Sequence, residues 1–350
     1  LIDTFVKLGS GVDVNSEGEL FRALKTNVAS DKIILTGVGK TKNEIRLGLE
    51  KKVLMIKAEC EEEVELINKI AGEMNVVASV ALRVNPDVDA KTHPYISTGL
   101  SKNKFGIDSS EALSIYRGRN KYKNILFTGI DMHIGSQITS IEPFVEAIQK
   151  LSDIYFTLKT EGLTLKHFDV GGGIGVQYNN EKSFTIEDFA QKTIPHLKKL
   201  GCKILFEPGR YLTANGGILL TEVLYNKSNG DKKFIIIDAA MNDLLRPTIY
   251  QAYHHIQPIK KEIDRTDIVA DIVGPVCETG DYFARDRKIS ETKSGEFLAI
   301  MSAGAYAMTM ASNYNARRRA PEIIIDGEKV ITARSRETFE HLLWDENLYL

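Results

Sequence analysis

The chain has 350 residues, 43% of them hydrophobic and 26% charged, and a formal net charge of -2. These values are typical of a globular protein and offer no general attraction for nucleic acid or an acidic membrane surface. No apolar run approaches the roughly 18 residues of a membrane span, and three cysteines without a C-x-x-C pair indicate neither a disulfide framework nor a zinc site. We therefore expect a cytoplasmic protein without a membrane segment.

The first residues predict a helix, because Leu1, Ile2, Phe5 and Leu8 recur at helical spacing before Gly9. The sequence lacks an initiating methionine and begins as if inside this helix. We therefore expect that a segment upstream of Leu1 is missing from the sequence.

Short apolar runs then alternate with amphipathic segments up to about residue 217. The alternation predicts parallel strands at 32–35, 53–56, 78–84, 125–134, 165–170 and 203–206, and helices at 16–25, 41–50, 61–74, 110–120, 143–160 and 185–200. Several strands end in residues that suit a functional edge, namely Gly37, Asn85, His133, Gly171 and Glu207. This pattern favours an α/β barrel over an open sheet, with the functional face at the carboxyl ends of the strands.

After residue 217 the character changes to β-rich runs joined by turns. Strands are expected at 218–225, 233–238, 268–273, 296–301, 322–325 and 329–332, and Asp326-Gly327 predicts a hairpin between the last two. A helix is expected at 336–343. The sequence thus predicts a barrel domain over 1–217 and a sandwich-like or barrel-like all-β domain, with a short terminal helix, over 218–350.

Three motifs at predicted strand ends suggest an anion or planar ligand. Glu207-Pro208-Gly209-Arg210 places a carboxylate and a guanidinium at one strand end, and His133-Ile134-Gly135-Ser136 offers an imidazole and a hydroxyl. The run 171–175 contains Gly171, Gly172 and Gly173, which allow close backbone approach to an anion but do not match the dinucleotide fingerprint. A turn with a surface ion pair and a structural histidine remain open alternatives for the first two.

The second domain contributes its own candidates. Cys277 and Glu278 follow a predicted strand in a Gly-Pro turn, where a thiol can serve as an acid, although a small buried cysteine is the alternative. Tyr306 follows Gly304-Ala305, while Arg246 and Tyr250 present a cation and a phenol on a predicted loop. A core tyrosine and a solvated arginine are the alternatives there. Asp13 could cap the helix that follows it.

Taken in order, these motifs resemble those of the diaminopimelate decarboxylase family. The resemblance covers essentially the whole chain, and it rests on the ordered motifs 11–20, 85–99, 104–106, 133–137, 171–175, 207–210, 277–279 and 304–306. The family belongs to group IV of the pyridoxal-phosphate-dependent decarboxylases, with an alanine-racemase-like fold. The resemblance therefore implies a TIM-like (β/α)8 barrel that binds pyridoxal 5′-phosphate, and decarboxylation of meso-2,6-diaminopimelate to L-lysine and CO2 in lysine biosynthesis.

The resemblance also implies roles around the cofactor. Glu207 matches the carboxylate on the pyridine nitrogen, and His133 matches the imidazole stacked on the ring. The positions expected to contact the cofactor, chiefly around its phosphate, are Asp13, Ser136, Gly172, Gly173, Gly209, Arg210 and Tyr306.

The positions that match the substrate side lie mostly in the second domain. Arg210, Arg246, Tyr250 and Tyr306 match groups that hold the distal carboxylate and its surroundings, and Glu278 matches the residue that meets the distal ammonium. Cys277 matches the acid that protonates the α-carbon. In the family Cys277 and Glu278 reach the partner subunit's active site, which implies a homodimer.

The lysine that holds the cofactor covalently in this family falls upstream of Leu1. Lys40, Lys91 and Lys104 are possible substitutes, but each is expected to be solvated. We expect a partial sequence of a working enzyme, and a non-catalytic cofactor-binding relative is the alternative.

A decarboxylase of ornithine, arginine or a carboxylated polyamine on the same scaffold also remains open. No metal site is predicted, because the histidines show no ligand spacing beyond His254-His255, a pair that is more typical of a surface.

Overall fold

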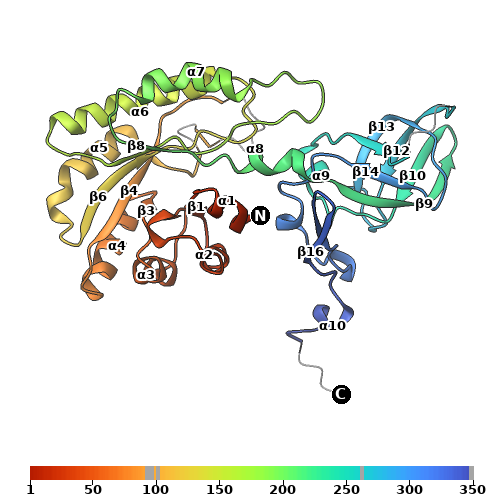
Figure 1. The fold of residues 1–350 in the computed structure, drawn as a ribbon, viewed down its shortest axis with the longest axis horizontal. Coiled ribbons are helices and arrows are strands. Elements are labelled where there is room, and N and C mark those ends of the chain that lie inside the picture. The colour runs from red at the N-terminus through yellow and green to blue at the C-terminus, as the bar shows by residue number, and fades with distance from the viewer. Residues whose placement is uncertain (91–97, 100–102, 261–263, 347–350) are drawn as a thin grey trace. The chain divides into compact units, whose positions relative to one another are not determined.

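The computed structural model describes residues 1–90, 98–99, 103–260 and 264–346 (Figure 1). They form two compact units. The first, called the barrel unit here, comprises Leu1–Gly175 and Ser183–Pro208, and the second, called the C-terminal unit, comprises Val176–Lys182 and Gly209–Leu350. Lys91 and His93 of the sequence motifs lie outside the described residues.

The barrel unit is built on a curved parallel sheet with the strand order β1-β2-β3-β4-β6-β7-β8, and β5 pairs with the end of β4. The strands are β1 (Val12–Val14), β2 (Ile33–Leu35), β3 (Met55–Ala58), β4 (Ala78–Asn85), β5 (Ile107–Asp108), β6 (Ile125–Asp131), β7 (His167–Asp169) and β8 (Lys203–Leu205). This arrangement is a TIM-like half-barrel, so the predicted α/β class and barrel type are confirmed.

Helices connect the strands and cover the outside of the sheet. They are α1 (Ile2–Lys7), α2 (Glu17–Leu24), α3 (Lys42–Glu50), α4 (Glu61–Glu73), α5 (Ser109–Arg117), α6 (Glu142–Thr160) and α7 (Ile186–Leu197). Figure 1 shows α6 and α7 lying side by side. Capping boxes begin two of them, with Thr41 and Glu44 at α3 and Thr185 and Asp188 at α7, which explains why the sequence located these starts closely.

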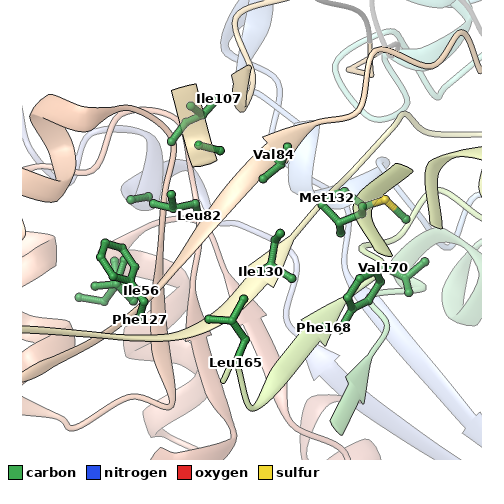
Figure 2. Packing of buried hydrophobic residues seen from close by; sticks show 14 of the residues in the cluster. Ile56, Leu82, Val84, Ile107, Phe127, Ile130, Met132, Leu165, Phe168 and Val170 are labelled. Carbon is green, nitrogen blue, oxygen red and sulfur yellow. The ribbon is translucent and has the colours of Figure 1, made fainter. Parts of the chain in front are cut away.

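The core of the barrel unit lies between sheet and helices. Apolar residues of the strands, among them Ile56, Leu82, Ile130 and Phe168, are almost fully buried and pack together (Figure 2). The six strands and seven helices expected here all form, including the helix at the first residues, which is α1. The sequence missed β1 and β5, because their residues, Val12-Asp13-Val14 and Ile107-Asp108, form no apolar run, whereas the equally short β2 is wholly apolar.

The C-terminal unit contains a six-stranded sheet with the order β11-β14-β9-β10-β12-β13, and a separate hairpin. The sheet strands are β9 (Leu219–Asn229), β10 (Lys232–Ile237), β11 (Ile256–Pro258), β12 (Asp267–Val273), β13 (Tyr282–Ser290) and β14 (Phe297–Ile300), and the hairpin joins β15 (Glu322–Asp326) to β16 (Lys329–Arg334). Three short α-helices belong to this unit, namely α8 (Gly209–Thr213), α9 (Arg246–Tyr250) and α10 (Phe339–Leu342).

The sequence missed two strands of this sheet, β11 and β13. β13 carries four charged residues within nine, because much of it faces solvent while Phe283, Ala284 and Ile289 face the core. Within the described residues, no helix is both long and apolar enough to cross a membrane.

Candidate active site

The carboxyl ends of three neighbouring strands in the barrel unit bring acidic side chains together. Asp131 ends β6, Asp169 ends β7, and Glu207 follows β8. Asp131 lies opposite Asp169 in the parallel register, and Asp169 lies opposite Leu205. Because parallel strands end at the same edge of the sheet, the register alone places the three carboxylates near one another.

A single buried lysine lies among these carboxylates. Lys57 projects from β3, and its side chain is 0% exposed. Its Nζ lies 2.9 Å from Asp131 Oδ1 and 2.9 Å from Asp169 Oδ2, and it donates a hydrogen bond to Glu207 Oε1. Lys57 is therefore the local counter-ion of three strand ends.

Burial and like charges change the acidity of this cluster. Burial raises the pKa of Asp131 to about 6, against the opposing effect of Lys57. Burial and the neighbouring Asp13 raise the pKa of Glu207 well above its ordinary value. The pKa of Lys57 is raised because Asp131, Glu207 and Asp169 outweigh its own burial. Burial and mutual repulsion therefore disfavour ionisation of these carboxylates, and the cluster favours an added cation.

A fourth carboxylate extends the cluster. Asp13, in β1, accepts a hydrogen bond from Thr36 Oγ1, and burial raises its pKa. Hydrogen bonding with Glu207 and the charge of Lys57 work against that rise. The interpretation of Asp13 as a helix cap is wrong. Ser16 caps α2, because its hydroxyl accepts a hydrogen bond from the Glu19 N–H. Asp13 instead faces the carboxylate cluster.

His133 follows the cluster along the chain and is neutral. The Gly172 N–H donates to its Nδ1 at 3.2 Å, so that nitrogen carries no proton. Burial, together with the charges of Arg83 and Lys57, lowers its pKa to about 3. Arg83 is itself held by Glu59 Oε1 at 2.9 Å. The 4.0 Å approach of His133 to Glu207 is therefore not an ion pair, and the imidazole offers a neutral ring face.

The glycine run lies against two other strand ends. A Cβ on Gly172 would lie 2.2 Å from the Glu207 carbonyl oxygen, and one on Gly173 would lie 2.2 Å from that of Gly135. Gly171 and Gly173 also have positive φ angles, 74° and 96°. Only glycine fits this packing, which brings the backbone beside both His133 and Glu207.

A second group of candidates gathers inside the C-terminal unit. Arg210 donates to the Tyr178 hydroxyl at 2.8 Å, and its guanidinium carbon lies 4.5 Å from the centre of the Tyr306 ring. Arg246 lies 4.3 Å from the centre of the Tyr178 ring. Both arginines are buried. These cation–π contacts hold the guanidinium groups without neutralising them.

His254 orients Arg246. Arg246 Nη1 lies 2.7 Å from His254 Nε2, while His254 Nδ1 lies 2.8 Å from the Met301 carbonyl oxygen. The carbonyl must accept from Nδ1–H, so Nε2 accepts from the guanidinium. Burial and the charge of Arg246 lower the pKa of His254 to about 4. The expectation of a surface histidine pair is wrong for His254, which is 0% exposed, whereas His255 is exposed.

Cys277 and Glu278 lie on an exposed turn of the same unit. Asn315 Nδ2 donates to Cys277 Sγ at 3.2 Å, and a hydrogen bond with Glu278 raises the pKa of Tyr314. Buried Asp281 fixes the turn by accepting from the backbone N–H of Val276 at 2.7 Å and of Met241 at 2.6 Å. The thiol and the carboxylate are thus held outward, so a buried structural cysteine is excluded here.

The remaining predicted residues lie on connecting segments. Ser136 is half-buried after β6, Gly209 begins α8, and Tyr250 ends α9. Lys104 is exposed as expected, but the expectation for Lys40 is wrong. The Lys40 side chain is 1% exposed, pairs with Glu63 at 2.9 Å, and donates to the backbone carbonyls of Gly37 at 2.6 Å and Lys57 at 2.5 Å.

Sequence analysis missed Lys57, Asp131, Asp169, Tyr178, His254 and Asp281. A signal existed for Lys57, because a charge within the apolar stretch 53–58 needs a buried partner. Oxygens of Asp131, Asp169 and Glu207 lie within 4.8 Å of one another, a spacing that suits a metal ion. The Lys57 ammonium contacts all three, so the charge requirement of this cluster is met from within the chain.

Comparison with known proteins identifies the class. A family model described as pyridoxal-dependent decarboxylase, pyridoxal binding domain, matches residues 1–214. The chain belongs to this family of pyridoxal-dependent decarboxylases, and pyridoxal phosphate is its cofactor.

More specific relatives agree with the resemblance seen in the motifs. The chain is 45% identical over 344 residues to the diaminopimelate decarboxylase of Aquifex aeolicus, an alignment that covers 98% of this chain and 82% of the relative. The diaminopimelate decarboxylase of Neisseria meningitidis serogroup A is 45% identical over 346 residues, with 99% and 85% covered. The predicted relation to diaminopimelate decarboxylases is confirmed.

Solved structures support the same relation. The diaminopimelate decarboxylase of Helicobacter pylori, complexed with L-lysine, matches with a TM-score of 0.94 at 41% identity, covering 98% of this chain and 86% of that one. The lysine decarboxylase of Selenomonas ruminantium matches with a TM-score of 0.82 at 22% identity, covering 93% and 83%, and shares the fold.

Proposed function

We propose that this chain decarboxylates meso-2,6-diaminopimelate to L-lysine and CO2 as the last step of lysine biosynthesis. The observation that carries the proposal is the Glu207–His133 strand-end pair, in a chain 45% identical over nearly its whole length to a diaminopimelate decarboxylase. The chain is a carboxy-lyase of the pyridoxal-dependent class.

The barrel unit fits the cofactor in charge and shape. Four carboxylates, from Asp13, Asp131, Asp169 and Glu207, interact with one ammonium, so the cluster can accept a second cation such as a protonated pyridine nitrogen. The glycine run leaves no room for side chains beside it, and His133 is a neutral ring. When bound, pyridoxal phosphate supplies an electron sink for the bond that breaks.

We assign the residues of the barrel unit accordingly. Glu207 binds the pyridine nitrogen, and its negative charge keeps that nitrogen protonated. His133 packs its uncharged face on the ring and is fixed in one tautomer by the Gly172 N–H. Asp13 supports Glu207. Residues 1–217 then form the cofactor-binding domain and 218–350 the second domain.

The phosphate side of the cofactor is assigned to donors that suit an anion. The proposed groups are Ser136, the backbone at Gly172, Gly173 and Gly209, the Arg210 guanidinium, and Tyr306. Arg210 supports this assignment, because it is buried yet held by phenol groups.

The substrate is assigned to groups of the C-terminal unit. Arg246 binds the distal carboxylate of the substrate, and Arg210, Tyr250 and Tyr306 surround it. His254 keeps the guanidinium of Arg246 in one orientation. Glu278 binds the distal ammonium. Cys277 delivers a proton to the α-carbon, which its exposed thiol and the Asn315 hydrogen bond support.

Substrate competition tests this function. The purified protein with pyridoxal phosphate should release CO2 from meso-diaminopimelate at least about 100-fold more efficiently than from ornithine or arginine, because a buried guanidinium left without its carboxylate costs binding energy. Faster turnover of ornithine, arginine or a carboxylated polyamine would replace the proposal with the corresponding decarboxylase. Cofactor binding without turnover of any of them would support the non-catalytic alternative.

A Cys277→Ala substitution should lower kcat by about 100-fold or more, because the proton donor is lost, and should leave the cofactor Kd unchanged. The rate of CO2 release measures kcat, and calorimetric titration measures the cofactor Kd. Cys202→Ala, at a half-buried thiol of the barrel unit, is the control. Normal turnover by Cys277→Ala would remove this residue from the mechanism.

We further propose a cytoplasmic homodimer in which Cys277 and Glu278 serve the partner's site. If so, mixing inactive Cys277→Ala with inactive Glu207→Gln protein should restore about a quarter of the activity, because half the dimers are hybrid and each hybrid has one intact site. Sedimentation should show the dimer. A dimer without restored activity would mean that Cys277 and Glu207 of the same subunit serve one site.

A further inference from the structure

Lys57 has no assigned role in the function proposed above, yet it is a fully buried charge of the barrel unit. Its side chain is 0% exposed, and its ammonium meets oxygens from three strand ends. Burying an ammonium is costly unless it is paired. Lys40, also buried, differs in that its ammonium meets one carboxylate, that of Glu63, and two backbone carbonyls.

The partners of Lys57 each lead to a different part of the candidate cofactor site. Asp169 contacts Lys57 through Oδ2 and accepts from the Gly171 N–H at 2.9 Å through Oδ1, so it links the lysine to the glycine run. Asp131 lies two residues before His133 in the chain. Glu207 binds Lys57 through Oε1, while its Oε2 lies nearest His133.

The charge balance indicates what Lys57 does for Glu207. Like charges on Asp13, Asp131 and Asp169 disfavour an ionised Glu207, and burial acts in the same direction. Lys57 opposes both effects on Glu207, Asp131 and Asp13. A protonated Glu207 cannot stabilise a protonated pyridine nitrogen, so the counter-ion favours the form of the carboxylate that can.

We propose that Lys57 is a positioning residue, which favours the ionised form of Glu207 and ties Glu207 through Asp169 to the glycine run, so that the cofactor ring binds protonated. This inference rests on the proposed function. It differs from a covalent role for the lysine, because the Nζ is committed to three carboxylates.

The test compares natural protein with Lys57→Met, which keeps the chain length and removes the charge. Calorimetric titration with pyridoxal phosphate is repeated from pH 5 to pH 9. The fall in affinity on the acid side of the profile, called the acid limb, reports protonation of the carboxylates in the cofactor-free protein. In Lys57→Met the midpoint of this fall should lie at least about one pH unit higher than in the natural protein. A loss of packing alone would weaken binding equally at every pH.

Lys40→Met is the control for the loss of a buried ammonium, since Lys40 pairs with Glu63 and touches Lys57 only through the Lys57 backbone carbonyl. Its acid limb should coincide with that of the natural protein. An unchanged limb in Lys57→Met, or an equal shift in Lys40→Met, would overturn the inference. Lys57→Gln, which retains a hydrogen-bond donor, replaces Lys57→Met if that variant does not fold.

A cofactor-free measurement separates this inference from the proposed function. If the natural protein binds no pyridoxal phosphate, the proposed function fails, and urea unfolding without cofactor then tests the counter-ion role. The stability deficit of Lys57→Met should grow as pH rises from 5 to 8, because uncompensated carboxylates ionise in the folded state. A deficit that is constant across this range would overturn the role of Lys57.

Discussion

The acidic cluster of the barrel unit and the arginine cluster of the C-terminal unit hold charge in opposite ways. Around Lys57, carboxylates outnumber the cation and share it through direct ion pairs. Arg246 instead contacts a neutral imidazole and a phenol ring, and no carboxylate pairs with it in the part of the chain that the structure describes. The first cluster retains affinity for a cation and the second for an anion.

The difference teaches how a buried charge stays available to a ligand. A carboxylate pair would neutralise Arg246, whereas π faces and a neutral acceptor stabilise it while leaving its charge unneutralised. Burial lowers the pKa of Arg246, and the surrounding tyrosines oppose this effect. In the acidic cluster the excess of carboxylates over lysine leaves negative charge available to a cationic ligand.

Glu207→Gln should have the largest effect on the acidic cluster. It removes the negative charge that faces the ring but keeps the shape, so kcat on meso-diaminopimelate should fall by about 100- to 1,000-fold. Steady-state CO2 release at saturating cofactor measures the loss. Glu142→Gln, at an exposed ion pair with Lys192, is the control. A variant with near-normal kcat would show that the acidic cluster is structural.

Arg246→Met should have the largest effect on the arginine cluster. It keeps most of the apolar stem and removes the guanidinium, so KM for meso-diaminopimelate should rise about 30-fold or more through loss of a charged pair. Substrate titration at fixed cofactor measures KM. Arg285→Met, an exposed arginine 4.1 Å from the Tyr282 ring centre, should leave KM unchanged. An equal rise in both variants would contradict a specific carboxylate site.

His254→Phe sharpens the comparison, because it keeps an aromatic ring and removes the acceptor that orients Arg246. KM should rise by about 10-fold, the cost of one hydrogen bond to a charged group, while kcat changes little. His255→Phe, at the exposed neighbour, is the matched control. A fall in kcat without a change in KM would mean that His254 does not act through Arg246.

The two clusters should also respond to pH with opposite signs. Because the pKa of His254 is lowered to about 4, its contribution to stability is complete above about pH 6.5 and is lost as pH falls toward 4. Because the pKa of Asp131 is raised to about 6, its stability contribution is present below about pH 4 and is lost as pH rises through 6.

Urea unfolding of natural protein, His254→Phe and Asp131→Asn between pH 4 and 7.5 measures these contributions. Each variant should lose its own component, of about 2 to 3 kcal/mol, from the pH profile. Parallel profiles for all three proteins would show that neither group carries the predicted titration.

Much of the chain was predictable from local pattern. The alternation of apolar runs and amphipathic segments located the main strands and helices, because one-sided burial leaves a period in the sequence. Glu207, His133 and the glycine run were noticed because they follow predicted strands, and their expected roles came from the resemblance carried by the ordered motifs. β1 was missed because Asp13 interrupts its two valines and leaves no apolar run.

What the sequence by itself determined is the kind of fold, the family resemblance and the residues of its motifs. Only the tertiary structure decided which side chains share a charge. Lys57 lies 74 residues from Asp131 and 150 from Glu207, and His254 became a buried acceptor only because Arg246 and the Met301 carbonyl flank it. Pairing of buried charges depends on distance in space and on desolvation, and neither quantity is written in the order of residues along the chain.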